Sequence, residues 1–128
     1  MKSPWKTIEP LRLGVDYLAL ASSIPPHSFR STGRLFRGSR VVGRQLQATD
    51  GVVGFSLLAE PLRKRYATVS IWRDEAALDA FSSASPHRQL MTDLAPEMNQ
   101  PRFVRWATTG DDGIPEWDAV LDRLGLTR

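Results

Sequence analysis

The spacing of apolar residues changes period several times along this chain, and the order of the changes constrains the fold more than any other feature. Runs typical of strands occupy residues 15–22, 52–59, 65–72 and 102–108. Helical spacing occupies residues 28–46 and, in two pieces, residues 75–94. The order is therefore strand, helix, strand, strand, helix, strand. This order predicts an α+β fold of the ferredoxin-like β-α-β-β-α-β type with an antiparallel sheet.

The run from Arg65 to Trp72 alternates strictly, so its side chains divide between two faces of the predicted sheet. One face carries Ala67, Val69 and Ile71, and the other carries Tyr66, Thr68, Ser70 and Trp72. We expect the two main helices to cover one face and to leave the face with Tyr66 and Trp72 open. Since an open apolar face usually marks an interface, we predict a homodimer. Two sheets stacked in this way would close a dimeric α+β barrel with an internal cavity.

The first predicted helix is amphipathic and strongly basic. Its arginines are spaced 4, 3, 3 and 4 residues apart, opposite the apolar stripe: Arg30, Arg34, Arg37, Arg40 and Arg44. The segment contains no lysine and few aromatic residues, which nucleic-acid-binding segments usually interleave with their arginines. We therefore expect a solvated helix face and no nucleic-acid partner. Docking of an acidic protein on this helix is the alternative.

A chain of 128 residues is long enough for one domain with a substantial core, and we predict a single domain over residues 1–128. Residues 1–12 are expected to form an irregular lead-in. Residues 111–128 are expected to form an extension with a short helix from Pro115 to Leu124. No apolar run approaches the ~20 residues of a membrane helix, and the first residues lack the apolar core of a signal peptide. A cytoplasmic location is expected.

Few residues of this chain suit common catalytic or metal chemistry. The absence of cysteine excludes disulfides, thiolate metal sites and thiol catalysis. The two histidines, His27 and His87, lack metal-ligand spacing, and no metal site is predicted. His87 follows Ser85 and Pro86, which are typical of a helix start with serine as the cap. The positive end of such a helix lowers the pKa of His87 and favours a neutral imidazole, which suits a base or a haem ligand.

The sheet face with Tyr66 and Trp72 has the mixed polarity of a ligand pocket rather than of a core. We predict that Tyr66, Trp72 and Phe81 line this pocket, with His87 as the catalytic residue. Arg105 lies on the same strand face as Phe103. It is either an anion anchor in the pocket or a charge on an edge strand.

The stretch from Tyr66 to His87, YATVSIWRDEAALDAFSSASPH, resembles the antibiotic biosynthesis monooxygenase superfamily. In that superfamily, a strand ending in an aromatic residue leads through an acidic cap into a helix and a Ser-Pro-His-like step. Residues 51–55 (GVVGF) are similar to its second strand, and residues 34–42 resemble the spheroidene monooxygenase branch. The resemblance covers residues 13–109. It implies a dimeric α+β barrel and activities that range from cofactor-free quinol oxidation to haem degradation.

The haem-degrading members use an asparagine, a tryptophan and a histidine that this chain lacks. The matching positions are Ala19 or Ala21, Phe81 and Met91, so haem degradation of that type is not expected. No cofactor is expected; haem is the alternative, because spheroidene monooxygenase is associated with it, and His87 would be its ligand.

The resulting prediction is a small monooxygenase-like protein that binds an apolar aromatic or polyene substrate in the barrel cavity. A ligand-binding or interaction protein of the same fold, without turnover, is the alternative.

Overall fold

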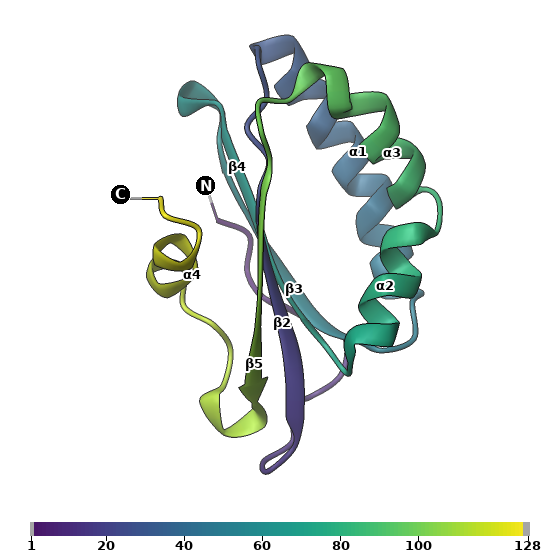
Figure 1. The fold of residues 1–128 in the computed structure, drawn as a ribbon, viewed down its shortest axis with the longest axis vertical. Helices are drawn as coiled ribbons and strands as arrows, with labels where there is room; N and C mark the ends of the chain where they lie inside the picture. Colours follow the sequence, from purple (N-terminus) through teal and green to yellow (C-terminus); the bar gives the residue numbers. More distant parts are fainter. Residues whose placement is uncertain (1, 127–128) are drawn as a thin grey trace.

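The four predicted strands lie in one antiparallel sheet, which a fifth, short strand extends at one edge (Figure 1). The computed structural model describes residues 2–126. Its strands are β1 (Lys6–Thr7), β2 (Asp16–Ser23), β3 (Val52–Glu60), β4 (Arg65–Trp72) and β5 (Arg102–Thr109). They are arranged in the order β1-β3-β4-β2-β5, with β2 and β4 adjacent at the centre. Apart from β1, this is the predicted ferredoxin-like arrangement, and the α+β prediction is confirmed.

Helices cover both faces of this sheet. One face carries α1 (Phe29–Gln47), α2 (Glu75–Ser83) and α3 (His87–Leu94), and the opposite face carries α4 (Trp117–Arg123) (Figure 1). Three short 3₁₀ turns complete the described elements: η1 (Pro61–Arg63), η2 (Ala95–Glu97) and η3 (Gly110–Asp112). Among residues 2–126, no helix combines the length and the apolar character that crossing a bilayer requires.

The side chains at the helix starts explain where α1 and α2 begin. The hydroxyl of Ser28 accepts a hydrogen bond from the backbone N–H of Ser31, and the carboxylate of Asp74 accepts one from the backbone N–H of Ala77. The start of α3 differs from the prediction, because Pro86 occupies the N-cap and no side chain caps the helix. His87 is therefore the first residue of α3.

The lead-in was also predicted incorrectly as wholly irregular. Within it, Lys6 and Thr7 form β1 against β3, and Lys2 forms an isolated bridge with Leu58. The predicted C-terminal helix is present but shorter, ending at Arg123. Met1, Thr127 and Arg128, which belong to the two predicted extensions, lie outside the described residues.

The prediction that the Tyr66 and Trp72 face lies open is wrong. Trp72 is 1% exposed and packs with Leu78 and Phe81 of α2. Tyr66 packs with Leu35 of α1, and its ring meets that of Phe36 edge-on. Helices α1, α2 and α3 thus cover the face that was predicted to be open. A strand's alternation separates two faces, but it does not say which face the helices will take.

The opposite face is covered by the two ends of the described chain. Val120, Leu121 and Leu124 pack from α4 and its C-cap on Ala67 and Val69 of β4. Nearer the start of the chain, Trp5 and Leu11 pack on the cluster that contains Ile71. The chain therefore closes both faces with its own residues, and the predicted sheet-to-sheet barrel interface through Tyr66 and Trp72 is incorrect.

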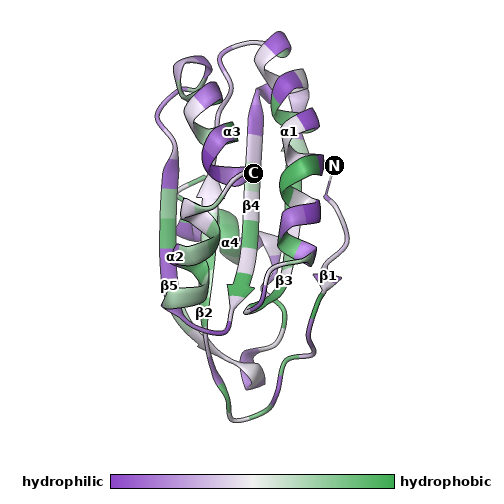
Figure 2. Ribbon diagram, turned by 90° about the vertical axis from the view of Figure 1, so that its right-hand side faces the viewer, coloured by the Kyte–Doolittle hydropathy of each residue, from purple (hydrophilic) through white to green (hydrophobic). Residues whose placement is uncertain are grey.

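Helix α1 has the predicted amphipathic character, with polar and apolar residues alternating along it in Figure 2. Its five arginines are exposed, as predicted. Its inner side approaches α3 closely at Gly38, where a Cβ would lie 2.4 Å from Cδ1 of Leu90. Only a residue without a side chain fits there unless Leu90 moves.

Candidate functional site

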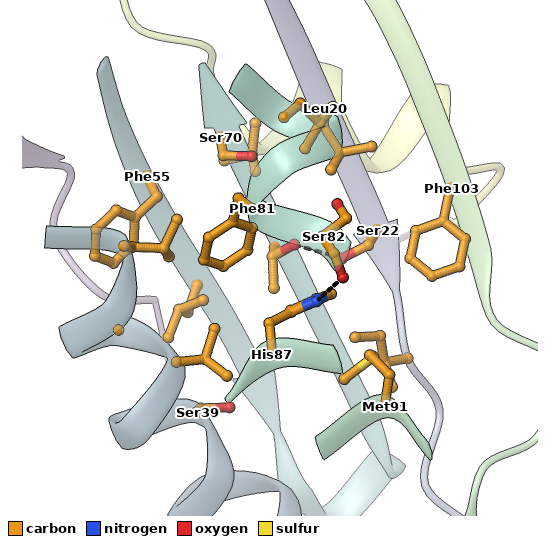
Figure 3. Close-up of a pocket in the computed structure, with 18 of the residues that line it drawn as sticks. Leu20, Ser22, Ser39, Phe55, Ser70, Phe81, Ser82, His87, Met91 and Phe103 are labelled. Atoms are coloured by element: carbon orange, nitrogen blue, oxygen red, sulfur yellow. Dashed lines mark hydrogen bonds between the residues drawn. The ribbon is translucent and has the colours of Figure 1, made fainter. Parts of the chain in front are cut away.

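A cavity of about 340 Å³ lies between the sheet and the helices α1, α2 and α3 of one chain (Figure 3). Its volume falls within the roughly 300–1,000 Å³ typical of small-molecule pockets. It was predicted between the sheets of two copies, and the structure instead places it inside a single protomer. All five predicted site residues line it: Tyr66, Trp72, Phe81, His87 and Arg105.

Most of the wall is apolar, and its parts come from distant segments of the chain. Leu20 and Phe55 project from the strands, while Leu46, Phe81 and Met91 project from the three helices. Phe81 packs against the indole of Trp72 at a ring-centroid distance of 5.2 Å. Such a wall suits an apolar ligand with few polar groups.

The polar side chains that stand on the strands inside the cavity are bonded to polar neighbours. The indole N–H of Trp72 donates to Oγ of Ser70 at 2.8 Å. The hydroxyls of Ser22 and Thr68 share a short hydrogen bond, and those of Ser39 and Tyr66 lie 2.5 Å apart. Because these groups form hydrogen bonds with one another, few of their donors and acceptors stay available to a ligand.

Burial raises the pKa of Tyr66, although its hydrogen bond with Ser39 acts in the opposite direction. The phenol therefore stays protonated at neutral pH. Since Ser39 also donates to the backbone carbonyl of Leu35 at 2.8 Å, the phenol is tied through Ser39 to α1.

His87 differs from the paired groups because only one of its ring nitrogens is engaged. Nδ1 lies 3.2 Å from the backbone carbonyl oxygen of Ser82, which accepts and so requires the proton on Nδ1. Nε2 then carries a lone pair, and the described residues offer it no hydrogen bond. The backbone N–H of His87 donates to Oε1 of Gln45, and the ring lies 4.9 Å from that of Phe81. These contacts hold the imidazole at the cavity wall.

The pKa of His87 is lowered, and burial is the main cause. The carbonyl of Ser82 acts in the opposite direction, because it stabilises the protonated ring. The predicted direction is confirmed, but its predicted cause, the positive end of a helix, is not the one that dominates. At neutral pH the ring is uncharged and Nε2 can accept a proton.

Arg105 lines the cavity, but its charge is already balanced. Its guanidinium bridges from β5 to α2, where Glu75 and Asp79 each lie 3.2 Å away. The sequence alternative of a charge on an edge strand is confirmed, because β5 lies at the sheet edge and Arg105 is exposed. Its two partners were not predicted, because they belong to a helix far away in sequence. Arg105 holds α2 against the sheet edge beside the cavity.

Of the residues that the helices contribute to the site, the sequence prediction named Phe81 and His87 and missed others. Ser39 and Met91 line the cavity, as does Ser82, whose carbonyl orients His87. A serine at position 39 within the apolar stripe of α1 was the one available signal. His27, the other histidine, is exposed in the loop before α1. Residues 2–126 hold no group of three or more acidic or histidine side chains that could bind a metal ion.

No family model matches the sequence, and no curated protein matches it. Solved structures share the fold at low identity. A candidate antibiotic biosynthesis monooxygenase from Nitrosomonas europaea is 13% identical, with a TM-score of 0.63 over 76% of this chain and 93% of that one. SnoaB, a cofactor-independent oxygenase from Streptomyces nogalater, is 16% identical, with a TM-score of 0.55 over 72% and 92% of the two chains.

A dimeric ferredoxin-like protein of unknown function from Jannaschia sp. CCS1 is also 16% identical, with a TM-score of 0.62 over 70% of this chain and 97% of that one. These similarities confirm, at the level of the fold, the predicted resemblance to the antibiotic biosynthesis monooxygenases. The spheroidene monooxygenase branch stays a prediction.

The lowered pKa of His87 predicts a pH-dependent stability. Below its ordinary pKa of 6.5 the unfolded chain takes up a proton that the folded chain resists. The free energy of unfolding should therefore be highest above about pH 6.5 and fall as the pH drops below it, until the folded-state pKa is reached. Urea unfolding between about pH 7.5 and 5 measures this slope. A His87→Gln variant should show a flatter profile than the wild type. An unchanged slope in His87→Gln would contradict the prediction.

Proposed function

We propose that this protein binds a small aromatic or polyene molecule in its cavity and oxidises it with O₂, as a monooxygenase without a bound cofactor. One observation carries the proposal. Within an apolar wall whose strand polar groups are paired with one another, His87 is neutral and keeps Nε2 free to accept a proton. The fold shared with SnoaB, described as a cofactor-independent oxygenase, supports the same chemistry.

In this reaction, Nε2 of His87 removes a proton from an activated CH₂ group of the substrate. The resulting anion is electron-rich and reacts with O₂ directly. Oxidation of CH₂ to a carbonyl by one O₂ places one oxygen atom in the product and releases the other as water. The CH₂ group supplies all four electrons, so no external reductant is needed. The apolar wall excludes bulk water from the intermediate.

Haem, the alternative cofactor, fits the cavity poorly. Its two propionates are anions, which charged hydrogen bonds from arginine or lysine would stabilise. Among the described residues that line the cavity, Arg105 is the only arginine or lysine, and Glu75 and Asp79 already balance it. We therefore derive no step through haem. Absorbance spectra recorded during a haemin titration test this point, and a Soret shift that His87→Ala abolishes would reverse it.

Ligand binding without turnover is the second candidate function, because the cavity alone supports it. The same residues would then hold a ligand, with His87 as a hydrogen-bond acceptor rather than as a base. Turnover separates the two candidates.

We also propose that the chain forms a homodimer, as the Jannaschia protein is described to do. The contact cannot use the Tyr66 and Trp72 face, which α1, α2 and α3 cover. Strand β5 lies at the sheet edge and exposes Phe103 to 57%, which makes this edge the surface we assign. Light scattering at micromolar concentration should give twice the 14.3 kDa of one chain, and Phe103→Asp should lower that mass. A wild-type monomer would refute the proposal.

A larger side chain at Gly43 should block the cavity. Gly43 lines the cavity from α1, and a Cβ there meets no atom within 4 Å, so leucine can enter without an initial clash. We expect Gly43→Leu to abolish the fluorescence rise of N-phenyl-1-naphthylamine, an uncharged aromatic probe, on binding to the protein. Replacing a helical glycine by leucine should stabilise α1 by about 0.5–1 kcal/mol, so the fold is retained.

Gly33→Leu is the matched control for the blocked cavity. Gly33 lies in the same helix at an exposed position, where a Cβ also meets nothing within 4 Å. This variant should bind the probe as the wild type does. Equal binding by Gly43→Leu would show that the probe does not occupy the cavity.

The role of His87 is tested by oxygen consumption. With anthrones, polycyclic compounds whose carbonyl group activates a CH₂ group, in the presence of a metal chelator, the wild-type protein should consume O₂ above the background rate. His87→Ala should lower kcat about 10²-fold or more, the effect of losing a general base. His27→Ala, a matched change at an exposed histidine, should leave kcat unchanged. Binding of the same compounds without any consumption of O₂ would favour the second candidate function.

A further inference from the structure

A second hollow, of about 640 Å³, lies at the end of the sheet where β2 ends and β4 and β5 begin. Four cationic residues line it, and we call it the basic groove: Arg63, Lys64, Arg65 and Arg102. Ser23, Gln100 and Leu124 contribute to the rest of its wall. None of the described residues that line it is acidic.

Arg102 is held in place by a neutral partner. Its Nη1 donates to the backbone carbonyl of Leu124 at 2.6 Å, which orients the guanidinium without neutralising it. The contact is close, because a Cβ at position 125 would lie 2.4 Å from the same nitrogen. Gly125, which also has a φ of 72°, makes this approach possible.

The other three cations are consecutive and are presented by the turn between β3 and β4. Lys64 adopts a left-handed conformation with a φ of 49°, which is uncommon for a residue with a side chain. Glu60 pairs with Arg65 at 3.3 Å and with Arg63 at 3.7 Å. This one carboxylate orients two of the four cations, and the described residues that line the groove supply four cations and no carboxylate.

The shape of the groove separates it from the other basic surface of the protein. The arginines of α1 lie along one exposed helix face, and none of them lines the basic groove or the cavity. In the basic groove, by contrast, guanidinium groups from the turn after β3 and from the start of β5 border one concave space. Arginine forms paired hydrogen bonds with phosphate oxygens, and lysine adds a compact charge.

We propose that the basic groove binds the phosphate groups of a small-molecule ligand. This site goes beyond the proposed oxygenase function, since its four cations lie outside the cavity. Phe103 borders it as well, so the site requires a dimer contact at the β5 edge that leaves Arg102 accessible. Arg102, preset by Leu124, and Arg65, held by Glu60, would contact the phosphate oxygens from two sides. Lys64 and Arg63 would close the open side.

Calorimetric titration of the full chain with inorganic diphosphate tests the proposal. The double variant Arg63→Ala, Lys64→Gly should bind diphosphate about tenfold more weakly or worse, because two charged hydrogen-bond donors are lost. Glycine at position 64 accepts the left-handed φ, so this variant keeps the backbone of the turn. Thermal unfolding of the variant, without ligand, checks that the fold is intact.

The matched control is Arg37→Ala, Arg40→Ala on α1, which removes the same charge at exposed positions outside the basic groove. It should bind diphosphate within about twofold of the wild type. Three results would overturn the proposal: no binding by the wild type, an equal loss in both double variants, or tighter binding of a single-stranded oligonucleotide than of diphosphate. The last result would assign the groove to nucleic acid. None of these results bears on oxidation, so the two proposals fail separately.

Discussion

The pairing of β2 with β4 at the centre of the sheet is the constraint from which the rest of the architecture follows. These strands are joined from Leu18 against Trp72 to Ser23 against Ala67. Because side chains alternate across each strand, this one register assigns every central residue to a face. Trp72 and Tyr66 then form the floor of the cavity, and Ala67 and Val69 form the bed for α4. If the register of a strand shifted by one residue, its side chains would move from one face of the sheet to the other.

The cavity exists because small polar side chains stand where a core would place large apolar ones. Ser22, Thr68 and Ser70 occupy the central strands beneath the helices and fill less space than leucine or phenylalanine would. Their hydroxyls bond sideways, to one another or to Trp72, instead of upward into the cavity. An unpaired hydroxyl there would cost about 1–3 kcal/mol. The pairing therefore makes an open, largely apolar space compatible with a stable fold.

The two proposed sites have opposite character although they use adjacent residues at the same strand ends. Tyr66 and Phe103 border the apolar cavity, while their neighbours Arg65 and Arg102 border the basic groove. The period of two along each strand sends one residue toward α3 and the next toward the side of α4. Phe103, at the sheet edge, lines both the cavity and the basic groove.

Local patterns were enough to predict the succession of strands and helices and the gathering of Tyr66, Trp72, Phe81 and His87 at one pocket. Each of these follows from propensity or from a period over a few residues, and such signals are present in any short stretch of the chain. The covered face, the partners of Arg105 and the basic groove were not predictable in this way. They depend on contacts between segments far apart in sequence, such as Arg105 with Asp79 or Arg102 with Leu124. Alternation defines two faces for each strand, but only the packing of the crossover helices and of α4 decides what each face meets.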